Sequence, residues 1–232
     1  MKQFSSNFPA ISASVSCMDL LHLENQIKEI EESDISFFHY DVVDGRFNQC
    51  FILGDTLLEQ MSKATKLPIE VHLAVYNPEE YIERFAKAGA DYITVQYESL
   101  TDPKRTFDMI RSFGCQPGIC YKSTTAPQDD FVEIAKDVSW ILKLTVNPGF
   151  SGQKIQSQSI EHIKEMKSLL FNAGLSTPIQ ADGNVNLETI PSLASAGASI
   201  FTGGTSGLFL KDNSIAVNVR DMLKKASENY HW

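Results

Sequence analysis

Short apolar runs alternate with longer amphipathic stretches from one end of the chain to the other. The short runs have the length and composition of buried strands, and they cover Ala10–Val15, Phe37–Asp41, Ile69–Leu73, Tyr92–Gln96, Gln116–Cys120, Trp140–Thr145, Pro178–Ala181 and Ser199–Thr202. The stretches between them have helical periodicity, and they cover Asp19–Glu32, Thr56–Thr65, Pro78–Ala88, Pro103–Phe113, Gln128–Ala135, Ser157–Asn172, Leu187–Ala196 and Val217–Ser227. This repetition of strand and helix predicts parallel strands joined by helical crossovers.

Turn and cap residues fall where these elements begin and end. Asn77 before Pro78 has the pattern of a helix start, with Asn as the cap and Pro at the first helical position. A glycine directly follows several predicted helices, where a left-handed residue favours termination: Gly89, Gly114, Gly174 and Gly197. The even size of the units predicts one α/β domain over residues 1–232, a (β/α)8 TIM barrel. A doubly wound parallel sheet is the alternative fold.

Composition and charge narrow the classes of function. Of the 232 residues, 43% are hydrophobic, which is enough for a sizeable core, and the formal net charge is −9. Because nucleic-acid binding depends on Lys and Arg that neutralise phosphates, this charge argues against a nucleic acid as partner. A small phosphate ester is not excluded, since backbone N–H groups at glycine loops can hold a phosphate without basic side chains.

Several features predict a cytoplasmic protein that does not associate with a membrane. The cysteines show no CxxC pair or zinc-ribbon spacing, which favours reduced thiols: Cys17, Cys50, Cys115 and Cys120. The N-terminal segment lacks the long apolar core of a signal peptide. No run approaches the roughly 20 apolar residues of a membrane span.

Polar residues at the predicted strand ends form the first candidate site. In a barrel of this kind, active-site groups come from the C-terminal ends of the strands. Those ends carry His39 and Asp41, then His72, then Asp182. His39 and Asp41 are two residues apart, so both point to the same face of a strand. Two imidazoles and two carboxylates suit one divalent metal ion such as zinc, manganese, iron or cobalt.

Each of these residues also has a simpler interpretation. A single buried His is commonly a hydrogen-bonded core residue, and an Asp followed by Gly is commonly a turn. Asp44, beside a glycine just after the second predicted strand, is assigned to turn formation. The metal-site hypothesis therefore depends on the joint placement of four residues at the strand ends.

Glycine-rich segments after the last three predicted strands form the second candidate site. They cover residues 147–153, 183–184 and 203–207. Phosphate sites in such barrels are commonly built after strands seven and eight, at the N-terminus of a short extra helix. The candidate phosphate-binding residues are Gly149, Phe150, Ser151, Gly152, Gly183, Asn184, Gly204 and Thr205.

In the order of its motifs the chain resembles the ribulose-phosphate 3-epimerase family over nearly its whole length. The matching segments are Ser14–Asp19, His39–Gly45, Val71–Leu73, Asn77–Glu79, Thr145–Phe150 with Gly152–Gln153, and Asp182–Gly183. Two further segments look closer to the D-allulose-6-phosphate 3-epimerase branch: Cys17–Leu21 and Gly204–Phe209.

The resemblance implies a TIM barrel of the ribulose-phosphate-binding type. It also implies the 3-epimerisation of a phosphorylated ketose by proton abstraction and return at C3. It implies that His39, Asp41, His72 and Asp182 hold the metal ion, with Asp41 and Asp182 as the acid/base pair. It further implies that Ser14 and His72 contact the sugar phosphate, and that the chain forms a homo-oligomer.

The chain departs from the family pattern in the predicted pocket wall. The family usually carries methionines near the metal, and the matching positions here are Val43, Ala74 and Leu144. The loop Arg46–Cys50 replaces a common His-Phe-Val-Pro-Asn sequence, Gln96 replaces a common His, and Asn184 replaces a second Gly.

Two other functions fit part of the pattern. The first is a phosphate-binding barrel decarboxylase acting on orotidine phosphate or keto-gulonate phosphate; those enzymes use an Asp-x-Lys-x-x-Asp set, and His39–Asp44 contains no Lys. The second is a catalytically diverged barrel that binds a sugar phosphate for a regulatory role. The altered pocket wall motivates this second alternative.

Overall fold

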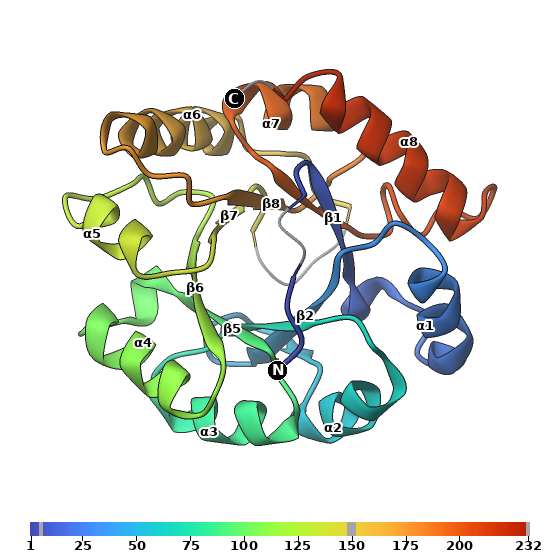
Figure 1. Ribbon diagram of the computed structural model, residues 1–232, viewed down its shortest axis with the longest axis horizontal. Helices are drawn as coiled ribbons and strands as arrows, with labels where there is room; N and C mark the ends of the chain where they lie inside the picture. Colours follow the sequence, from blue (N-terminus) through green and yellow to red (C-terminus); the bar gives the residue numbers. More distant parts are fainter. Residues whose placement is uncertain (5–6, 148–151, 231–232) are drawn as a thin grey trace.

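In residues 1–4, 7–147 and 152–230, which the computed structural model describes, parallel strands form a closed barrel inside a ring of helices (Figure 1). The barrel strands are β1 (Ala10–Ser14), β2 (Phe37–Asp44), β4 (Ile69–Ala74), β5 (Tyr92–Gln96), β6 (Gln116–Tyr121), β7 (Ile141–Leu144), β8 (Ile179–Asp182) and β9 (Ile200–Gly203). The helices are α1 (Leu23–Glu31), α2 (Asp55–Ala64), α3 (Glu79–Ala88), α4 (Pro103–Ser112), α5 (Phe131–Lys136), α6 (Ser157–Asn172), α7 (Ile190–Ala196) and α8 (Ile215–Ser227). The predicted TIM barrel is confirmed, and the doubly wound alternative is wrong.

The barrel closes where the first strand pairs with the second. The strand order is β1-β9-β8-β7-β6-β5-β4-β2, and β1 pairs in turn with β2. Ser14 lies opposite His39 in the closing pair. In the neighbouring β2–β4 pair, His39 lies opposite Glu70 and Asp41 lies opposite His72. This register brings polar residues from three strands side by side on the inner face.

A short hairpin arm extends β2 beyond the barrel. The strand β3 (Phe51–Ile52) pairs antiparallel with Val43 and Asp44. Asp44 makes the turn that starts this arm, because its Oδ1 accepts hydrogen bonds from the N–H groups of Arg46 and Phe47, each at 2.9 Å. The predicted role of Asp44 in turn formation is confirmed. The prediction omits β3, since two residues are too few to show an alternating pattern.

Helix ends agree with the prediction better than helix starts do. The glycines predicted to terminate helices all have positive φ angles: Gly89, Gly114, Gly174 and Gly197. The predicted cap at Asn77 is wrong, because Asn77 has a φ of 50° and Pro78 occupies the cap position of α3. Two 3-10 helices also form after strands, at Val15–Cys17 and Tyr97–Ser99.

Some helices begin later than predicted because local hydrogen bonds form turns first. α1 begins at Leu23 rather than at Asp19, whose Oδ1 accepts from the N–H of Leu21 at 3.0 Å. α7 begins at Ile190 rather than Leu187, and in the preceding turn Asn186 Oδ1 accepts from the N–H groups of residues 188 and 189. α5 likewise begins late, at residue 131.

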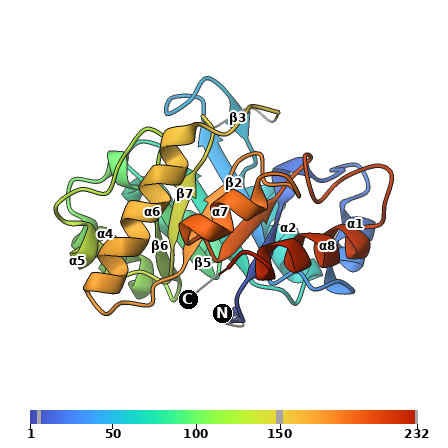
Figure 2. The ribbon, with the colours of Figure 1, turned by 90° about the horizontal axis from the view of Figure 1, so that it is seen from above.

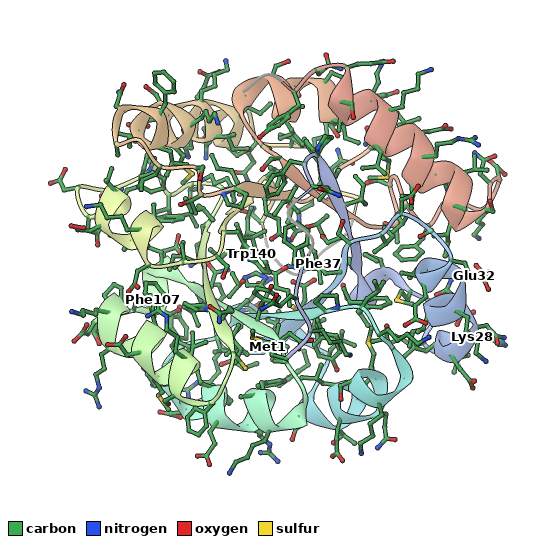
Figure 3. The ribbon with its side chains drawn as sticks, viewed as in Figure 1. Met1, Lys28, Glu32, Phe37, Phe107 and Trp140 are labelled. Atoms are coloured by element: carbon green, nitrogen blue, oxygen red, sulfur yellow. The ribbon has the colours of Figure 1, made fainter. Side chains whose placement is uncertain are left out.

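An aromatic layer fills the N-terminal end of the barrel interior. Phe37 stacks on Trp140 with ring centroids 5.2 Å apart, and Phe4 packs edge-on against Phe37 at 5.3 Å. Figure 3 shows Phe37 and Trp140 inside the ring of strands, whereas Lys28 lies on the outside of the surrounding ring of helices. Closing this end leaves the C-terminal end as the place where the interior meets solvent.

Polar side chains form the interior layer above the aromatic rings. They are completely or almost completely buried, and they include Ser12, Glu70, Thr94, Gln180 and Thr202. On the outward faces of the strands, apolar residues pack against the helices in one continuous core. The outer faces of the strands are therefore apolar, whereas the interior is aromatic at its N-terminal end and polar above that layer.

Two further predictions concern cysteines and membranes. All four cysteines are unpaired, as the sequence predicts. Within the described ranges, each helix is either too short or too polar to be a candidate for crossing a bilayer.

Candidate active site

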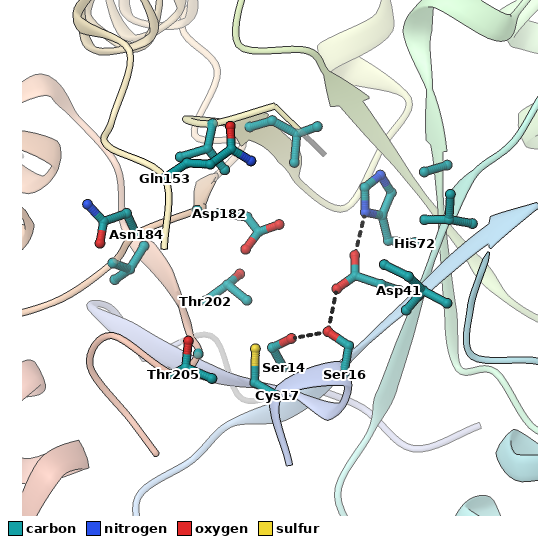
Figure 4. Close-up of a pocket in the computed structure, with 18 of the residues that line it drawn as sticks. Ser14, Ser16, Cys17, Asp41, His72, Gln153, Asp182, Asn184, Thr202 and Thr205 are labelled. Atoms are coloured by element: carbon teal, nitrogen blue, oxygen red, sulfur yellow. Dashed lines mark hydrogen bonds and ion pairs between the residues drawn. The ribbon is translucent and has the colours of Figure 1, made fainter. Parts of the chain in front are cut away.

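A cavity of about 430 Å³ opens at the C-terminal ends of the barrel strands. Its wall contains polar residues from β1, β2, β4, β8 and β9: Ser14, Asp41, His72, Asp182 and Thr202 (Figure 4). Figure 2 shows β3 at this end of the molecule and the N-terminus at the other end. The cavity thus lies at the end of the barrel where the sequence predicts the site.

Three of the predicted metal ligands meet at the wall formed by β2 and β4. Asp41 Oδ1 lies 3.0 Å from Nε2 of His39 and 3.0 Å from Nδ1 of His72. One ligand atom from each residue lies within 4.8 Å of the other two. The His39 side chain is completely buried, whereas 18% of the Asp41 side chain is exposed. Asp41 therefore faces the cavity, and His39 lies behind it.

Asp182 approaches the cluster of His39, Asp41 and His72 from β8. In the barrel, β8 is separated from β2 by β9 and β1. Oδ2 of Asp182 lies 3.7 Å from Nε2 of His39, and 21% of the Asp182 side chain is exposed. Thr145 holds this strand end, because its N–H donates to the Asp182 carbonyl at 2.7 Å and its hydroxyl donates to the Gly183 carbonyl at 2.5 Å. The carboxylates of Asp41 and Asp182 both point into the cavity (Figure 4).

The two carboxylates have pKa shifts of opposite sign. Burial disfavours ionisation of Asp41, but the charges and hydrogen bonds of His39 and His72 outweigh it and hold the Asp41 pKa well below its usual value. Burial raises the pKa of Asp182 to about 6, against the opposing charge of His39. Burial would lower the pKa of His39, but Asp41 and Glu70 raise it well above the usual value. The site thus combines one ionised carboxylate with one that holds a proton more readily.

Glycine-containing loops form the part of the cavity wall next to Asp182. They contribute Gly152, Gly183, Asn184, Gly204 and Thr205. Gly183 has a φ of 113°, and a Cβ there would lie 2.5 Å from Val146 Cγ2, so only glycine fits. Asn184 has a φ of 49°, a left-handed conformation that Asn tolerates better than most residues. This tolerance explains how Asn can replace a glycine here.

The segment after β9 forms one hydrogen-bonded turn, in which the N–H of Leu208 donates to the Gly204 carbonyl at 2.9 Å. The described stretch between β9 and α8 contains no helix, so a turn takes the place of the short extra helix that such barrels commonly have. A Cβ on Gly204 would lie 3.1 Å from Cys17 Sγ, so glycine lets this turn approach the loop after β1. The candidates Gly149, Phe150 and Ser151 lie outside the described residues.

Two serines connect β1 to the charged cluster. Ser14 and Ser16 line the cavity, and their Oγ atoms are 3.0 Å apart. The Ser16 hydroxyl also donates to Asp41 Oδ2, at 3.4 Å. Ser14 is therefore in the position that the sequence predicts. Ser16 adds a polar group for which no role was predicted.

Comparison with known proteins identifies the family to which this site belongs. The Ribulose-phosphate 3 epimerase family matches residues 10–209. The chain belongs to this family. It is 36% identical over 218 residues to the ribulose-phosphate 3-epimerase of Methanocaldococcus jannaschii, with 94% of this chain and 91% of that protein covered. It is 34% identical over 209 residues to the Bacillus subtilis ribulose-phosphate 3-epimerase, with coverage of 90% and 96%.

Membership of the ribulose-phosphate 3-epimerase family, a family of carbohydrate-phosphate epimerases, confirms the resemblance found in the motifs. The fold itself is shared more widely. The tryptophan synthase α-subunit of Pyrococcus furiosus superposes with a TM-score of 0.65 at 12% identity, with 97% of this chain and 98% of that chain covered. At that identity the likeness concerns the barrel alone.

The donor set of this epimerase-family site fits a divalent metal ion. Imidazole nitrogens and carboxylate oxygens bind zinc, manganese, iron and cobalt, and His39, Asp41 and His72 bring three such atoms together. Asp182 is not part of this three-residue cluster, but its Oδ2 lies 3.7 Å from His39 Nε2. The described residues therefore include a cluster that could hold the ion.

Two buried groups lie behind the histidines: Glu70, which the sequence analysis missed, and Gln96, which it named only as a departure from the family pattern. Glu70 lies behind His39, with Oε2 2.7 Å from His39 Nδ1. Gln96 lies behind His72, with its Nε2 2.8 Å from His72 Nε2. Glu70 precedes His72 by two residues in a predicted strand. The spacing rule that pairs His39 with Asp41 would therefore also have placed Glu70 on the inner face.

The positions at which the epimerase family usually carries methionines all line the cavity here: Val43, Ala74 and Leu144. Val43 and Ala74 pack together with Phe47, from the altered loop after β2, in a small apolar cluster. Leu144 packs instead with Cys120 and Leu142 in a second small cluster, so the departures from the family pattern occur at more than one place in the cavity wall.

Proposed function

We propose that the protein is a metal-dependent 3-epimerase of a phosphorylated ketose, of the ribulose 5-phosphate or allulose 6-phosphate type. The observation that carries this proposal is the convergence of His39, Asp41, His72 and Asp182 at a cavity that glycine loops also line. Membership of an epimerase family supports the reaction class.

Asp41 and Asp182 would carry out the proton transfers. In the substrate, C3 bears a hydrogen next to the C2 carbonyl. One carboxylate accepts that proton, which leaves an enediolate, and the other carboxylate returns a proton to the opposite face and inverts C3. The origin of the two side chains on β2 and β8, with two strands between them, supports access to both faces of a planar intermediate.

A divalent ion held by the four side chains would supply Lewis-acid stabilisation of the negative charge on the enediolate oxygens. His72 and Ser14 border the same space and would orient the sugar oxygens. Thr145 would keep Asp182 in place, since it fixes the backbone of Asp182 and Gly183 by hydrogen bonds.

The loops around Gly152, Gly183 and Gly204 would bind the phosphate through backbone N–H groups, with the Thr205 hydroxyl as a further donor. Among the described residues that line the cavity, none is a Lys or an Arg. Backbone donors at close-approaching glycines do not need basic side chains. This mode of binding is compatible with the net charge of −9.

The test is exchange of the C3 hydrogen with solvent. Ribulose 5-phosphate, allulose 6-phosphate and related ketose phosphates are incubated with the protein in D₂O, with zinc, manganese, iron or cobalt ions supplied separately. We expect the C3 proton signal to disappear from the NMR spectrum of at least one substrate. Absence of exchange with every sugar and metal would overturn the epimerase assignment.

The alternative is a catalytically diverged barrel that binds a sugar phosphate for regulation. The substitutions at Val43, Ala74 and Leu144, which line the cavity, and the altered loop after β2 favour it. It predicts that the purified protein binds ketose phosphates, retains no stoichiometric metal and catalyses no C3 exchange. Metal analysis of the purified protein separates the two functions.

We further propose that the protein is a single domain, that it is cytoplasmic and that it forms a homo-oligomer. Leu21 and Phe51, near the cavity mouth, are 90% and 86% exposed, and contact with a second copy would remove these apolar surfaces from water. We expect light scattering on the purified chain to give at least twice the mass of 25.9 kDa. A monomeric mass would remove this part of the proposal.

A further inference from the structure

Glu70 lies inside the barrel below the cavity, and its side chain is completely buried. Four donors surround its two oxygens. His39 Nδ1 lies 2.7 Å and Gln180 Nε2 lies 3.0 Å from Oε2. The Thr94 hydroxyl lies 2.6 Å and Trp140 Nε1 lies 2.9 Å from Oε1. Because a carboxylate has about four acceptor positions, this one is fully hydrogen-bonded.

These partners favour the ionised form of Glu70. The indole N–H of Trp140 can only donate, and Thr94 and Gln180 also present donors. The carboxylate is therefore an acceptor toward all four neighbours.

An ionised Glu70 determines the protonation of the His39 ring. Because the carboxylate can only accept, the ring nitrogen that faces it, Nδ1, carries a proton. The other nitrogen, Nε2, lies 3.0 Å from Asp41 Oδ1 and 3.7 Å from Asp182 Oδ2. When the ring is neutral, its lone pair is therefore on the nitrogen that faces the candidate metal ligands.

We propose that Glu70 is a positioning residue that fixes His39 as the Nδ1–H tautomer and aims its Nε2 lone pair at the metal. The inference rests on the proposed metal site and adds a residue that does not touch the ion. Glu70 does not line the cavity, and of its four hydrogen-bond partners only His39 is a proposed metal ligand. Carboxylate partners of this kind orient ligating histidines and increase their basicity.

Glu70→Gln tests the proposal with almost no change in side-chain volume. The amide oxygen would accept from Thr94 and Trp140, so the amide NH₂ would face His39 Nδ1. That nitrogen would then accept a hydrogen bond, and the proton would move to Nε2, where it blocks metal binding. We expect the affinity for Co²⁺, measured by competition with a chelating indicator, to fall by about 10- to 100-fold.

Thr94→Val is the matched control. It also removes one hydrogen bond from the Glu70 carboxylate, but from Oε1, the oxygen that does not face His39. We expect this variant to lose thermal stability and to keep Co²⁺ affinity close to that of the parent. Equal losses of affinity in the two variants would mean that Glu70 only stabilises the barrel, and the proposal would be overturned.

The proton on His39 gives a second readout that does not need metal. In ¹⁵N-labelled parent protein we expect a slowly exchanging proton on Nδ1 of His39, and in Glu70→Gln we expect that proton to be lost. A parent protein without an Nδ1 proton would overturn the assignment even if the Gln variant does not fold. A parent that binds no Co²⁺ but shows this proton would reject the metal site and keep the Glu70–His39 pairing.

Discussion

The cavity wall has two parts: in the charged side, side chains from β2, β4 and β8 carry the charge, and in the loop side, loops after β8 and β9 present backbone and small residues. Asp41, His72 and Asp182 belong to the charged side, and Gly183 and Gly204 to the other. The charged side is fixed by strand register and by buried partners. The loop side is fixed by backbone conformations that only a few residue types adopt.

This division between a charged side and a loop side explains how an acidic protein can act on an anionic substrate. The charged side is suited to hold a cation and to move protons, because its groups are close together and have opposite pKa shifts. The loop side is suited to an anion because glycines let backbone groups approach it. Changes on the charged side should therefore affect the reaction rate, and changes on the loop side should affect binding.

The largest effect is expected for Asp182→Asn. Loss of the proposed proton-transfer group should reduce C3 exchange by about 10²- to 10⁴-fold, whereas phosphate affinity should change little. NMR in D₂O measures the exchange, and metal titration shows whether the ion is still bound. Asp44→Asn is the control, because Asp44 Oδ1 makes a backbone turn outside the cavity and Asn can make the same turn. Near-parent exchange in the Asp182 variant would contradict its assignment.

Metal removal should have the second-largest effect on C3 exchange. Dialysis against a chelator should lower C3 exchange more than about 100-fold, since a bound cation contributes several kcal/mol of charge stabilisation. Adding back a divalent ion should restore the rate. Inorganic phosphate binding, measured by calorimetry on the metal-free protein, should persist because the loop side does not include the ion. Full exchange in metal-free protein would reject the role of the metal.

Gly183→Ala should affect binding and stability rather than proton transfer. The substitution forces a non-glycine residue to a φ of 113° and a Cβ against Val146, so we expect a loss of about 1–3 kcal/mol in the free energy of unfolding. The KM for the sugar phosphate should rise as the loop moves.

Gly114→Ala is the control for backbone strain. Gly114 has a φ of 82°, but a Cβ there meets nothing within 4 Å, and the residue follows α4 rather than bordering the cavity. This variant should lose stability without a change in KM. An unchanged KM in Gly183→Ala as well would contradict the proposed phosphate site.

The smallest effect is expected for Thr205→Val, which removes one hydroxyl donor from the loop side. Loss of one hydrogen bond should weaken phosphate binding by about 1 kcal/mol, or roughly fivefold. Ser206→Ala should have less effect on binding, because the Ser206 hydroxyl already donates to the Val185 carbonyl at 3.3 Å. Calorimetry compares the two variants, and a larger loss in the Ser206 variant would shift the proposed donor to Ser206.

Local patterns predicted much of the charged side. Alternation within a strand placed His39 and Asp41 on one face, and strand ends marked His72 and Asp182. The same rule also applies to Glu70, but a single acid inside a predicted strand belongs to no motif that would indicate a function. Its role became visible through contacts with Thr94, Trp140 and Gln180, which are distant in sequence.

The loop side was predicted less completely. Glycine spacing indicated where turns would form, but it could not distinguish the single turn at Gly204 from a short helix. Nor could it show that Asn184 adopts the left-handed conformation of a glycine. Those outcomes depend on how closely the loops after β1, β8 and β9 approach one another.

The sequence by itself determined the order of strands and helices, and it marked the strand ends at which polar groups occur, because residue periodicity and turn chemistry are local properties. Tertiary structure alone decided that Asp182 lies 3.7 Å from His39, and that Glu70 lies behind that ring with its four donors. Such distances are set by closure of the barrel and by the register between its strands. Both depend on packing of the entire ring, and no single segment encodes them.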